Sequence, residues 1–322
     1  MNTYTLNESG ILVPRIRDLH ILIDDGGDSE VDFLGYTCIM VDEYAYREIE
    51  RRAKDFCSAN QIASLHARDL RFENRDLTDM NEYESLYRQL FEFTIYELRR
   101  ANYQRVFSFL TSEKTVSSVF DAQNESFEKS EKLPHGAILS EKYRKLYSHI
   151  TFPTFELLKR IGKVDDDMRF YIHIDRKDDF QDLAEEIVSL KGNIAASLGP
   201  VRKAIAAIFN SYKNLILHMK ARVDGIHIGD SSSAPIIGVV DAFSNFSYNF
   251  AKVVIQGLDH STETQLRKYR VFSDVLTTFS GEEASHLDEL ESNIRSGFSF
   301  KDRKIIPNTE RAISTLEIMH AN

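Results

Sequence analysis

Three aspartates occupy positions at which a carboxylate could do metal chemistry. Asp24 and Asp175 each follow a short apolar run, and Asp241 stands inside the apolar segment 236–243. Carboxylate oxygens are the ligands that Mg²⁺ and Mn²⁺ prefer. Two such ions can activate water and neutralise the charge on a scissile phosphate during phosphoryl transfer. Asp24, Asp175 and Asp241 are therefore candidate metal ligands and candidate catalytic residues.

The same aspartates also have ordinary structural interpretations. Asp24 and Asp25 precede two glycines, and Asp-Asp-Gly-Gly is a common turn sequence. Asp175 could cap a following helix. Asp241 favours the metal interpretation, because an acid among apolar neighbours is costly to bury without a partner or an ion. Spacing alone leaves both interpretations open.

The elements that must position these residues follow from the hydrophobic pattern. Extended and apolar runs predict strands at 18–24, 33–41, 104–110, 168–175 and 214–223. Helical spacing predicts helices at 42–59, 82–100, 180–190, 200–209 and 235–257, and helical sequence at 138–161 that forms either two helices or one helix kinked at Pro153. We expect a tight turn at 24–28, a loop or hairpin connection at 224–233, and helical sequence from 258 to Asn322 that is broken around Gly297 and Pro307.

Alternating strands and helices predict an α/β fold, a mixed sheet flanked by helices. The first two strands are expected to pair as an antiparallel hairpin. We expect one domain over residues 1–260 with a helical insertion around 113–165, and a C-terminal helical extension over 261–322. The strand that ends at Asp175 is expected to lie inside the sheet, because it is too apolar for an open edge.

Composition excludes several classes of protein. A net charge of −10 argues against a generic DNA-coating protein, although a local basic stripe could still contact phosphate. We find no secretory signal pattern and no apolar run of membrane-spanning length, so we expect a cytoplasmic protein without a membrane partner. Two cysteines are too few for a disulfide framework or a cysteine-based zinc site.

Four short motifs occur in an informative order. They are Ile23-Asp-Asp-Gly-Gly-Asp28, Leu65-His-Ala-Arg-Asp-Leu70, Ile172-His-Ile-Asp175 and Val239-Val-Asp-Ala-Phe243, the last preceded by Asp230-Ser231. Together they resemble the domain-of-unknown-function 3800 family of bacterial and phage-borne proteins. Two positions depart from the family pattern: Ser64 stands where the family often has Glu, and Asp25-Gly26 replaces Glu-Ser.

The resemblance implies a ribonuclease H-like fold and a divalent-metal-dependent nuclease, in a phage-defence or mobile-element setting. It places Asp24, Asp175 and Asp241 at the metal, with Mg²⁺ or Mn²⁺ as cofactor, and His66 beside them. The substrate would be a nucleic acid, with RNA and DNA undecided. The alternative, favoured by Ser64, is a catalytically inactive ribonuclease H-like module that binds a partner protein or nucleic acid.

Further polar residues near the motifs are secondary candidates. Asp25 and Asp69 could add carboxylates, and Arg176 with Lys177 could contact phosphate. His66 could bind metal, move a proton or contact phosphate, or simply hydrogen-bond a carbonyl group. A structural role is favoured for His173 in the strand, and a turn for His227 in its glycine-rich segment.

Overall fold

The computed structural model describes residues 4–6, 12–14, 18–28, 33–67, 72–73, 79–119, 148, 152–161, 168–175, 222–229, 234–280 and 285–321. The strands are β1 Tyr4–Leu6, β2 Leu12–Pro14, β3 Asp18–Asp28, β4 Phe33–Asp42, β5 Ser64–Leu65, β6 Phe72–Glu73, β7 Tyr103–Thr111, β8 Arg169–Asp175, β9 Arg222–Gly229, β10 Phe298–Lys301, β11 Lys304–Pro307 and β12 Ile313–Ala321. The helices are α1 Glu43–Ala59, α2 Met80–Arg100, α5 Phe152–Ile161, α8 Pro235–Gln256, the 3₁₀ turn η4 Leu258–His260, α9 Glu263–Ser280 and α10 Ser285–Gly297. Among the described helices, none combines the length and the apolar character that crossing a membrane requires.

A six-stranded mixed sheet forms the centre of the described fold, in the order β12-β7-β4-β3-β8-β9. The strands β3, β4, β7 and β12 pair antiparallel, one after the next. On the other side of β3, the strands β8 and β9 run parallel to it. The predicted α/β class, the mixed sheet and the antiparallel hairpin are confirmed. The interior position of β8 is also confirmed, and its residues Phe170, Ile172 and Ile174 are buried.

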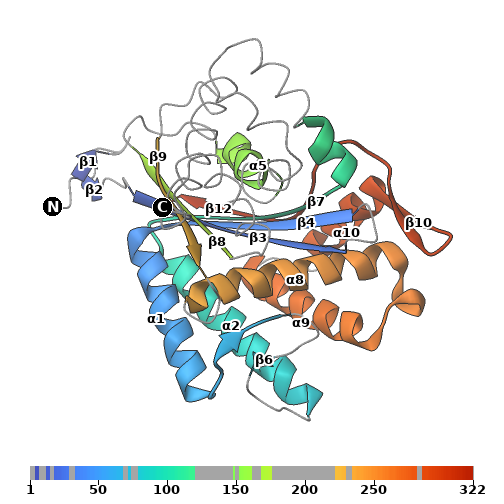
Figure 1. The fold of residues 1–322 in the computed structure, drawn as a ribbon, viewed down its shortest axis with the longest axis horizontal. Helices are drawn as coiled ribbons and strands as arrows, with labels where there is room; N and C mark the ends of the chain where they lie inside the picture. Colours follow the sequence, from blue (N-terminus) through green and yellow to red (C-terminus); the bar gives the residue numbers. More distant parts are fainter. Residues whose placement is uncertain are drawn as a thin grey trace, which may run out of the picture.

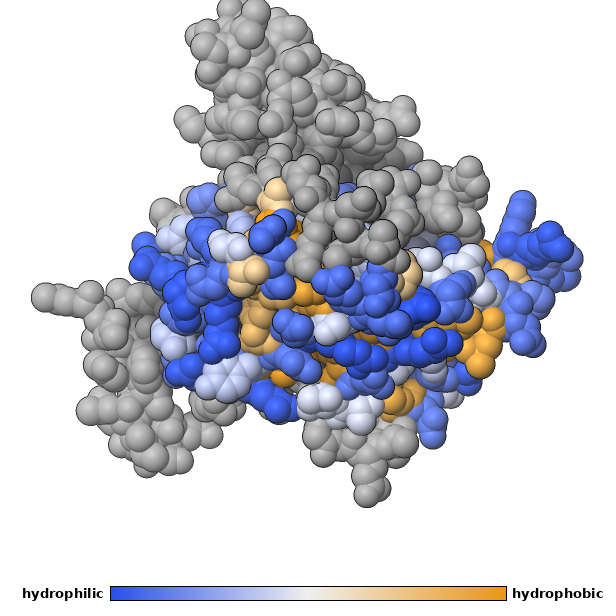
Figure 2. All heavy atoms as spheres, turned by 90° about the horizontal axis from the view of Figure 1, so that it is seen from below, coloured by the Kyte–Doolittle hydropathy of each residue, from blue (hydrophilic) through white to orange (hydrophobic). Residues whose placement is uncertain are grey.

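Helices lie on both faces of this sheet (Figure 1). The main apolar core fills the space between one face and helices α1, α2, α8, α9 and α10. Helix α5 lies on the opposite face, where the Cys38 thiol contacts the carbonyl oxygen of Pro153 at 3.5 Å. Seen from below, the described surface is mostly hydrophilic, with hydrophobic residues showing in seams between polar ones (Figure 2).

Helix boundaries follow the chemistry of the sequence. Asp42 caps α1 by accepting a hydrogen bond from the N–H of Ala45, and Asp79 caps α2 through the N–H of Asn81. Pro235 opens α8, where the missing N–H costs no helical bond. Pro153 also lies in a first turn, that of α5, so α5 begins there without an internal kink. The helical sequence predicted before it lies, apart from Ser148, outside the described residues. The predicted helices 180–190 and 200–209 lie outside the described residues.

The expected tight turn at 24–28 is wrong. Strand β3 continues to Asp28 and pairs with β4 over its whole length, with Gly26 opposite Gly35. The glycines serve packing instead, because the side chain of Tyr248 lies against both. A Cβ at Gly26 would lie 3.0 Å from Tyr248 Cβ, and one at Gly35 would lie 2.9 Å from Tyr248 Cδ2.

Two further expectations fail because distant pairing overrides local pattern. Residues 224–229, expected in a loop, belong to β9, which is held against β8. The chain after Gly297, expected to be helical, forms the β10–β11 hairpin and then β12, which pairs with β7 in the main sheet. The C-terminal segment therefore contains the helices α9 and α10 but ends as a strand of the same sheet. Of the strand expected at 214–223, only its last two residues are described, within β9.

Candidate functional site

Asp24 and Asp175 stand side by side where two parallel strands part. The parallel pairing of β3 with β8 ends with Ile23 opposite Ile174, and each aspartate is the next residue. Neighbouring strands lie about 4.8 Å apart, so the two aspartates are adjacent and share one face by alternation. The chain turns from β3 toward β4 on one side and returns to β8 on the other. Such a switch point, at the carboxyl ends of parallel strands, is where α/β sheets bind ligands.

Helix α8 crosses this edge and brings Asp241 to it. A Cβ at Gly229, the partner of Asp175 on β9, would collide with the side chain of Ile237. Further along the helix, the Ser244 hydroxyl donates to the carbonyl oxygen of Asp24 at 3.3 Å. Asp241 is one turn after Ile237 and one turn before Ser244, on the same helical face. It therefore lies over the carboxyl end of β8, between the two contacts.

His66 lies on the other flank of Asp241. The Nδ1 atom of His66 is 3.4 Å from the Asp241 carboxylate, which also accepts a 2.8 Å hydrogen bond from the N–H of Ala67. The Tyr87 hydroxyl donates to the carbonyl oxygen of His66 at 2.8 Å. Helix α8 approaches so closely here that a Cβ at Gly238 would lie 2.8 Å from the carbonyl oxygen of Leu65. The backbone at His66 is thus fixed from three sides, while its ring remains partly exposed.

A buried lysine completes this arrangement. Lys268 of α9 is 3% exposed, and its ammonium group donates to the carbonyl oxygen of Ala67 at 2.8 Å and to Asn245 Oδ1 at 2.6 Å. The Ala67 peptide is therefore held at its N–H by Asp241 and at its C=O by Lys268. Lys268 is not among the site residues predicted from the sequence. Its spacing with Val271, Phe272 and Val275 puts it on the apolar face of α9, and a lysine there is a detectable signal.

The donor chemistry fits a hard divalent ion. Asp24 and Asp175 offer carboxylate oxygens at one edge, and Asp241 offers another from above. Within the described ranges, no three acidic, histidine or cysteine side chains form a ready-made metal cluster. Mg²⁺ sites commonly use one or two carboxylates and leave the remaining positions to water and substrate phosphate. Asp24 and Asp175 would hold such an ion, with Asp241 and His66 beside it.

The secondary candidates are distributed differently. Asp25 alternates with Asp24 and so points to the opposite face of the sheet, away from α8. There it pairs in register with Tyr36, whose pKa is raised above its usual value by burial and by the Asp25 charge. Asp25 is therefore not brought to the site. Asp69, Arg176 and Lys177 lie outside the described residues.

Comparison of the chain with protein-family models, with curated proteins and with solved structures finds no match. The geometry of the site therefore carries the functional conclusion.

Three histidines lie beside the acid edge on the same face of the sheet. The ring nitrogens of His20 and His173 are 2.8 Å apart, and His20 also contacts the carboxylate of Glu43 through Nε2. Burial, with the neighbouring histidines His20 and His227, lowers the pKa of His173 to about 3. Burial also lowers the pKa of His20, although Glu43 acts in the opposite direction. His173 is therefore neutral at physiological pH.

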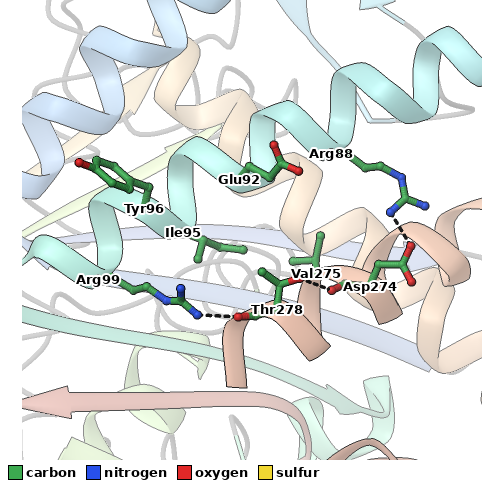
Figure 3. A pocket seen from close by; sticks show the side chains of 8 residues that line it. All are labelled: Arg88, Glu92, Ile95, Tyr96, Arg99, Asp274, Val275 and Thr278. Carbon is green, nitrogen blue, oxygen red and sulfur yellow. Dashed lines mark hydrogen bonds and ion pairs between the residues drawn. The ribbon is translucent and has the colours of Figure 1, made fainter. Parts of the chain in front are cut away.

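A separate cavity lies between α2 and α9 (Figure 3). Its volume is about 220 Å³, below the range of ordinary ligand pockets. Arg88 forms an ion pair with Asp274 across it, and Arg99 donates to the carbonyl oxygen of Thr278. These groups join the two helices, and none of the predicted site residues lines the cavity.

Proposed function

We propose that this protein is a divalent-metal-dependent nuclease of the ribonuclease H-like type. One observation carries the proposal: Asp24 and Asp175 are adjacent at the switch point of the sheet, beneath the helix that carries Asp241. Metal-dependent phosphodiester hydrolysis uses carboxylates grouped around one phosphate position, and among the described residues this is the edge to which the strands bring the predicted acids.

The strand order supports the fold part of the proposal. Three consecutive antiparallel strands, β3, β4 and β7, are followed by β8 and β9, which run parallel to β3 on its other side. This mixed order is compatible with a ribonuclease H-like sheet. The additional strand β12 extends the sheet beyond β7.

Each residue has a separate chemical task in this proposal. A bound Mg²⁺ or Mn²⁺ would activate water and neutralise phosphate charge. Asp24 and Asp175 supply oxygen donors for it, and Asp241 supplies a further carboxylate while it orients His66. The half-exposed His66 imidazole can hydrogen-bond a phosphate oxygen or transfer a proton to the leaving group. Lys268 keeps the His66 backbone in place through Ala67.

A nuclease assay tests the proposal directly. End-labelled single-stranded and duplex RNA and DNA are incubated with the protein in Mg²⁺, in Mn²⁺ and in EDTA. We expect cleavage that requires the metal and falls at least about a hundredfold in Asp24→Asn and Asp175→Asn. Asp259→Asn, at an exposed aspartate of η4, is the matched control and should retain full activity. Cleavage that survives EDTA, or that Asp175→Asn leaves intact, contradicts the proposal.

A second candidate function is a non-catalytic module that binds a nucleic acid or a protein. The observation that favours it is the use of Asp241 in a structural hydrogen bond to Ala67. Ser64, buried in β5 where the resembling family often has an acid, points the same way. This candidate predicts binding of a nucleic acid or a partner without cleavage in any metal.

A further inference from the structure

Three histidine rings cross the sheet in a row beside the acid edge. They are His20 of β3, His173 of β8 and His227 of β9, here called the histidine row. The ring centroids of His20 and His173 are 5.1 Å apart, and those of His173 and His227 are 4.8 Å apart with planes inclined by only 15°. The ring of Tyr46 from α1 stacks on the first two, at 4.1 and 4.7 Å.

Exposure changes sharply along the row. His20 and His173 are buried, and their ring nitrogens bond each other and Glu43. His227, at the outer end, is exposed to solvent. The row is therefore a line of planar rings that is anchored in the core by the hydrogen bond between His20 and His173 and ends in a ring at the surface.

Two glycines flank His227 on its own strand. Gly225 stands opposite Tyr171 and Gly229 opposite Asp175, two residues on either side of His227 and on the same face. A Cβ at Gly229 would lie 2.4 Å from Ile237 Cδ1, so helix α8 fills the space on that side of His227, whereas Gly225 adds no side chain on the other side. Besides the stack with His173, the ring of Tyr171 lies nearby, with centroids 6.3 Å apart. Glycine in a strand often marks the close approach of another molecule.

The surface ring and the acids are close enough to serve one ligand. His227 precedes Gly229, the partner of Asp175, by two residues, which is about 6–7 Å along a strand. With the strand spacing of about 4.8 Å added, His227 lies about 8 Å from Asp175, so a planar group stacked on His227 would be within reach of one nucleotide of that carboxylate, with Asp24 one strand further away. A nucleobase joined to a phosphate matches this pair of features, since every base offers a π-face.

We propose that His227 is a stacking platform for an unpaired base of a single-stranded nucleic acid whose backbone reaches the acid edge. The inference rests on the proposed function and adds a preference for single strands. In a duplex, both faces of each internal base are covered by its neighbours, so a side chain can stack only on a base that is single-stranded or extruded.

The absence of tryptophan from the chain allows a direct test. The substitution His227→Trp, here called the platform variant, places a single indole at the end of the row, and base stacking on it should quench its fluorescence. Leu258→Trp, at an exposed position of η4 beyond the far end of α8, is the control variant. Both proteins are titrated, with Ca²⁺ in place of Mg²⁺, with single-stranded DNA and RNA oligonucleotides, the corresponding duplexes and an oligonucleotide with abasic sites.

We expect a single-stranded oligonucleotide to quench the indole of the platform variant saturably, with little quenching by the duplex or the abasic strand. The indole of the control variant should not be quenched by any of them. In the otherwise unchanged protein, His227→Ala should weaken single-strand binding at least about fivefold, and His227→Phe should restore most of it. Absent quenching in the platform variant, equal quenching by the abasic strand, or unchanged affinity in His227→Ala would each overturn the proposal.

The two proposals fail in different measurements. If oligonucleotides are cleaved at Asp24 and Asp175 but the platform variant is never quenched, the platform is wrong and the nuclease stands. If single strands quench the platform variant and no metal supports cleavage by the unsubstituted protein, the platform stands and the nuclease is wrong.

Discussion

The carboxylate of Asp241 and the backbone N–H of Ala67, 174 residues apart in the chain, are joined by a 2.8 Å hydrogen bond. The same carboxylate faces His66 and lies over the end of β8. Asp241 therefore combines a structural contact with a position at the acid edge. The two roles can be separated by changing the charge and the hydrogen bond independently.

Asp241→Asn removes the charge and keeps an oxygen that can accept from Ala67. We expect the free energy of unfolding in EDTA to change by less than about 1 kcal/mol, while metal-dependent activity is lost. Asp241→Ala removes the acceptor too and should cost roughly 1–3 kcal/mol, because a partly buried N–H loses its partner. Urea denaturation in EDTA and cleavage assays measure the two effects. If both variants were destabilised strongly and equally, the negative charge of Asp241, and not only its hydrogen bond to Ala67, would be required to stabilise the fold.

Lys268→Met tests the clamp on the Ala67 peptide. Methionine fills a similar volume but cannot donate to Ala67 or Asn245, so we expect a loss of about 1–3 kcal/mol of stability. Lys54→Met, which breaks an exposed pair with Glu50 on α1, should change stability by less than about 0.5 kcal/mol. If both variants unfold at the same urea concentration, the clamp contributes nothing.

Gly238→Ala tests the approach of α8 to β5. Alanine normally stabilises a helix by up to about 1 kcal/mol relative to glycine, but here its Cβ would collide with Leu65. The nearest atoms include the Leu65 backbone, which cannot rotate away, so we expect destabilisation of about 1–3 kcal/mol and displacement of His66. At Gly229 the obstacle is the end of the flexible Ile237 side chain, so Gly229→Ala should cost less. A stabilised Gly238→Ala protein would contradict this packing.

Acid should destabilise the protein through His173. Burial lowers its pKa to about 3 in the fold, whereas an unperturbed histidine has a pKa of about 6.5, so between these pH values the unfolded chain binds a proton that the folded protein does not. With respect to this group the protein is most stable above about pH 6.5, and it loses stability progressively as the pH falls from about 6.5 toward 3. In EDTA, His173→Gln should therefore make unfolding less dependent on pH in this window, whereas His260→Gln, at an exposed histidine, should not. An unchanged pH profile in His173→Gln would show that another group is responsible.

Local sequence determined much of the fold and indicated which aspartates are candidate metal ligands. The apolar runs before Asp24 and Asp175 marked buried strands, because a sheet covered on both faces requires continuous hydrophobic sequence. Asp42 and Pro235 marked helix starts, because capping and the missing proline N–H act over a few residues. Asp241 was singled out by its apolar neighbours, and the structure places it over the strand end.

Only the tertiary structure decided how these pieces meet. Asp24 and Asp25 have similar local surroundings, yet pairing with β4 and β8 turns one toward α8 and the other away. Gly26 has the local sequence of a turn residue, but it lies in β3, where Tyr248, more than two hundred residues later in the chain, occupies the space that a side chain would need. His227 has the local sequence of a turn residue, but the pairing of β9 with β8 places it in a strand. The sequence around Lys268 does not indicate that its partner is Ala67. Each outcome depends on long-range pairing and packing, whose free energy outweighs weak local preferences and is not encoded in neighbouring residues.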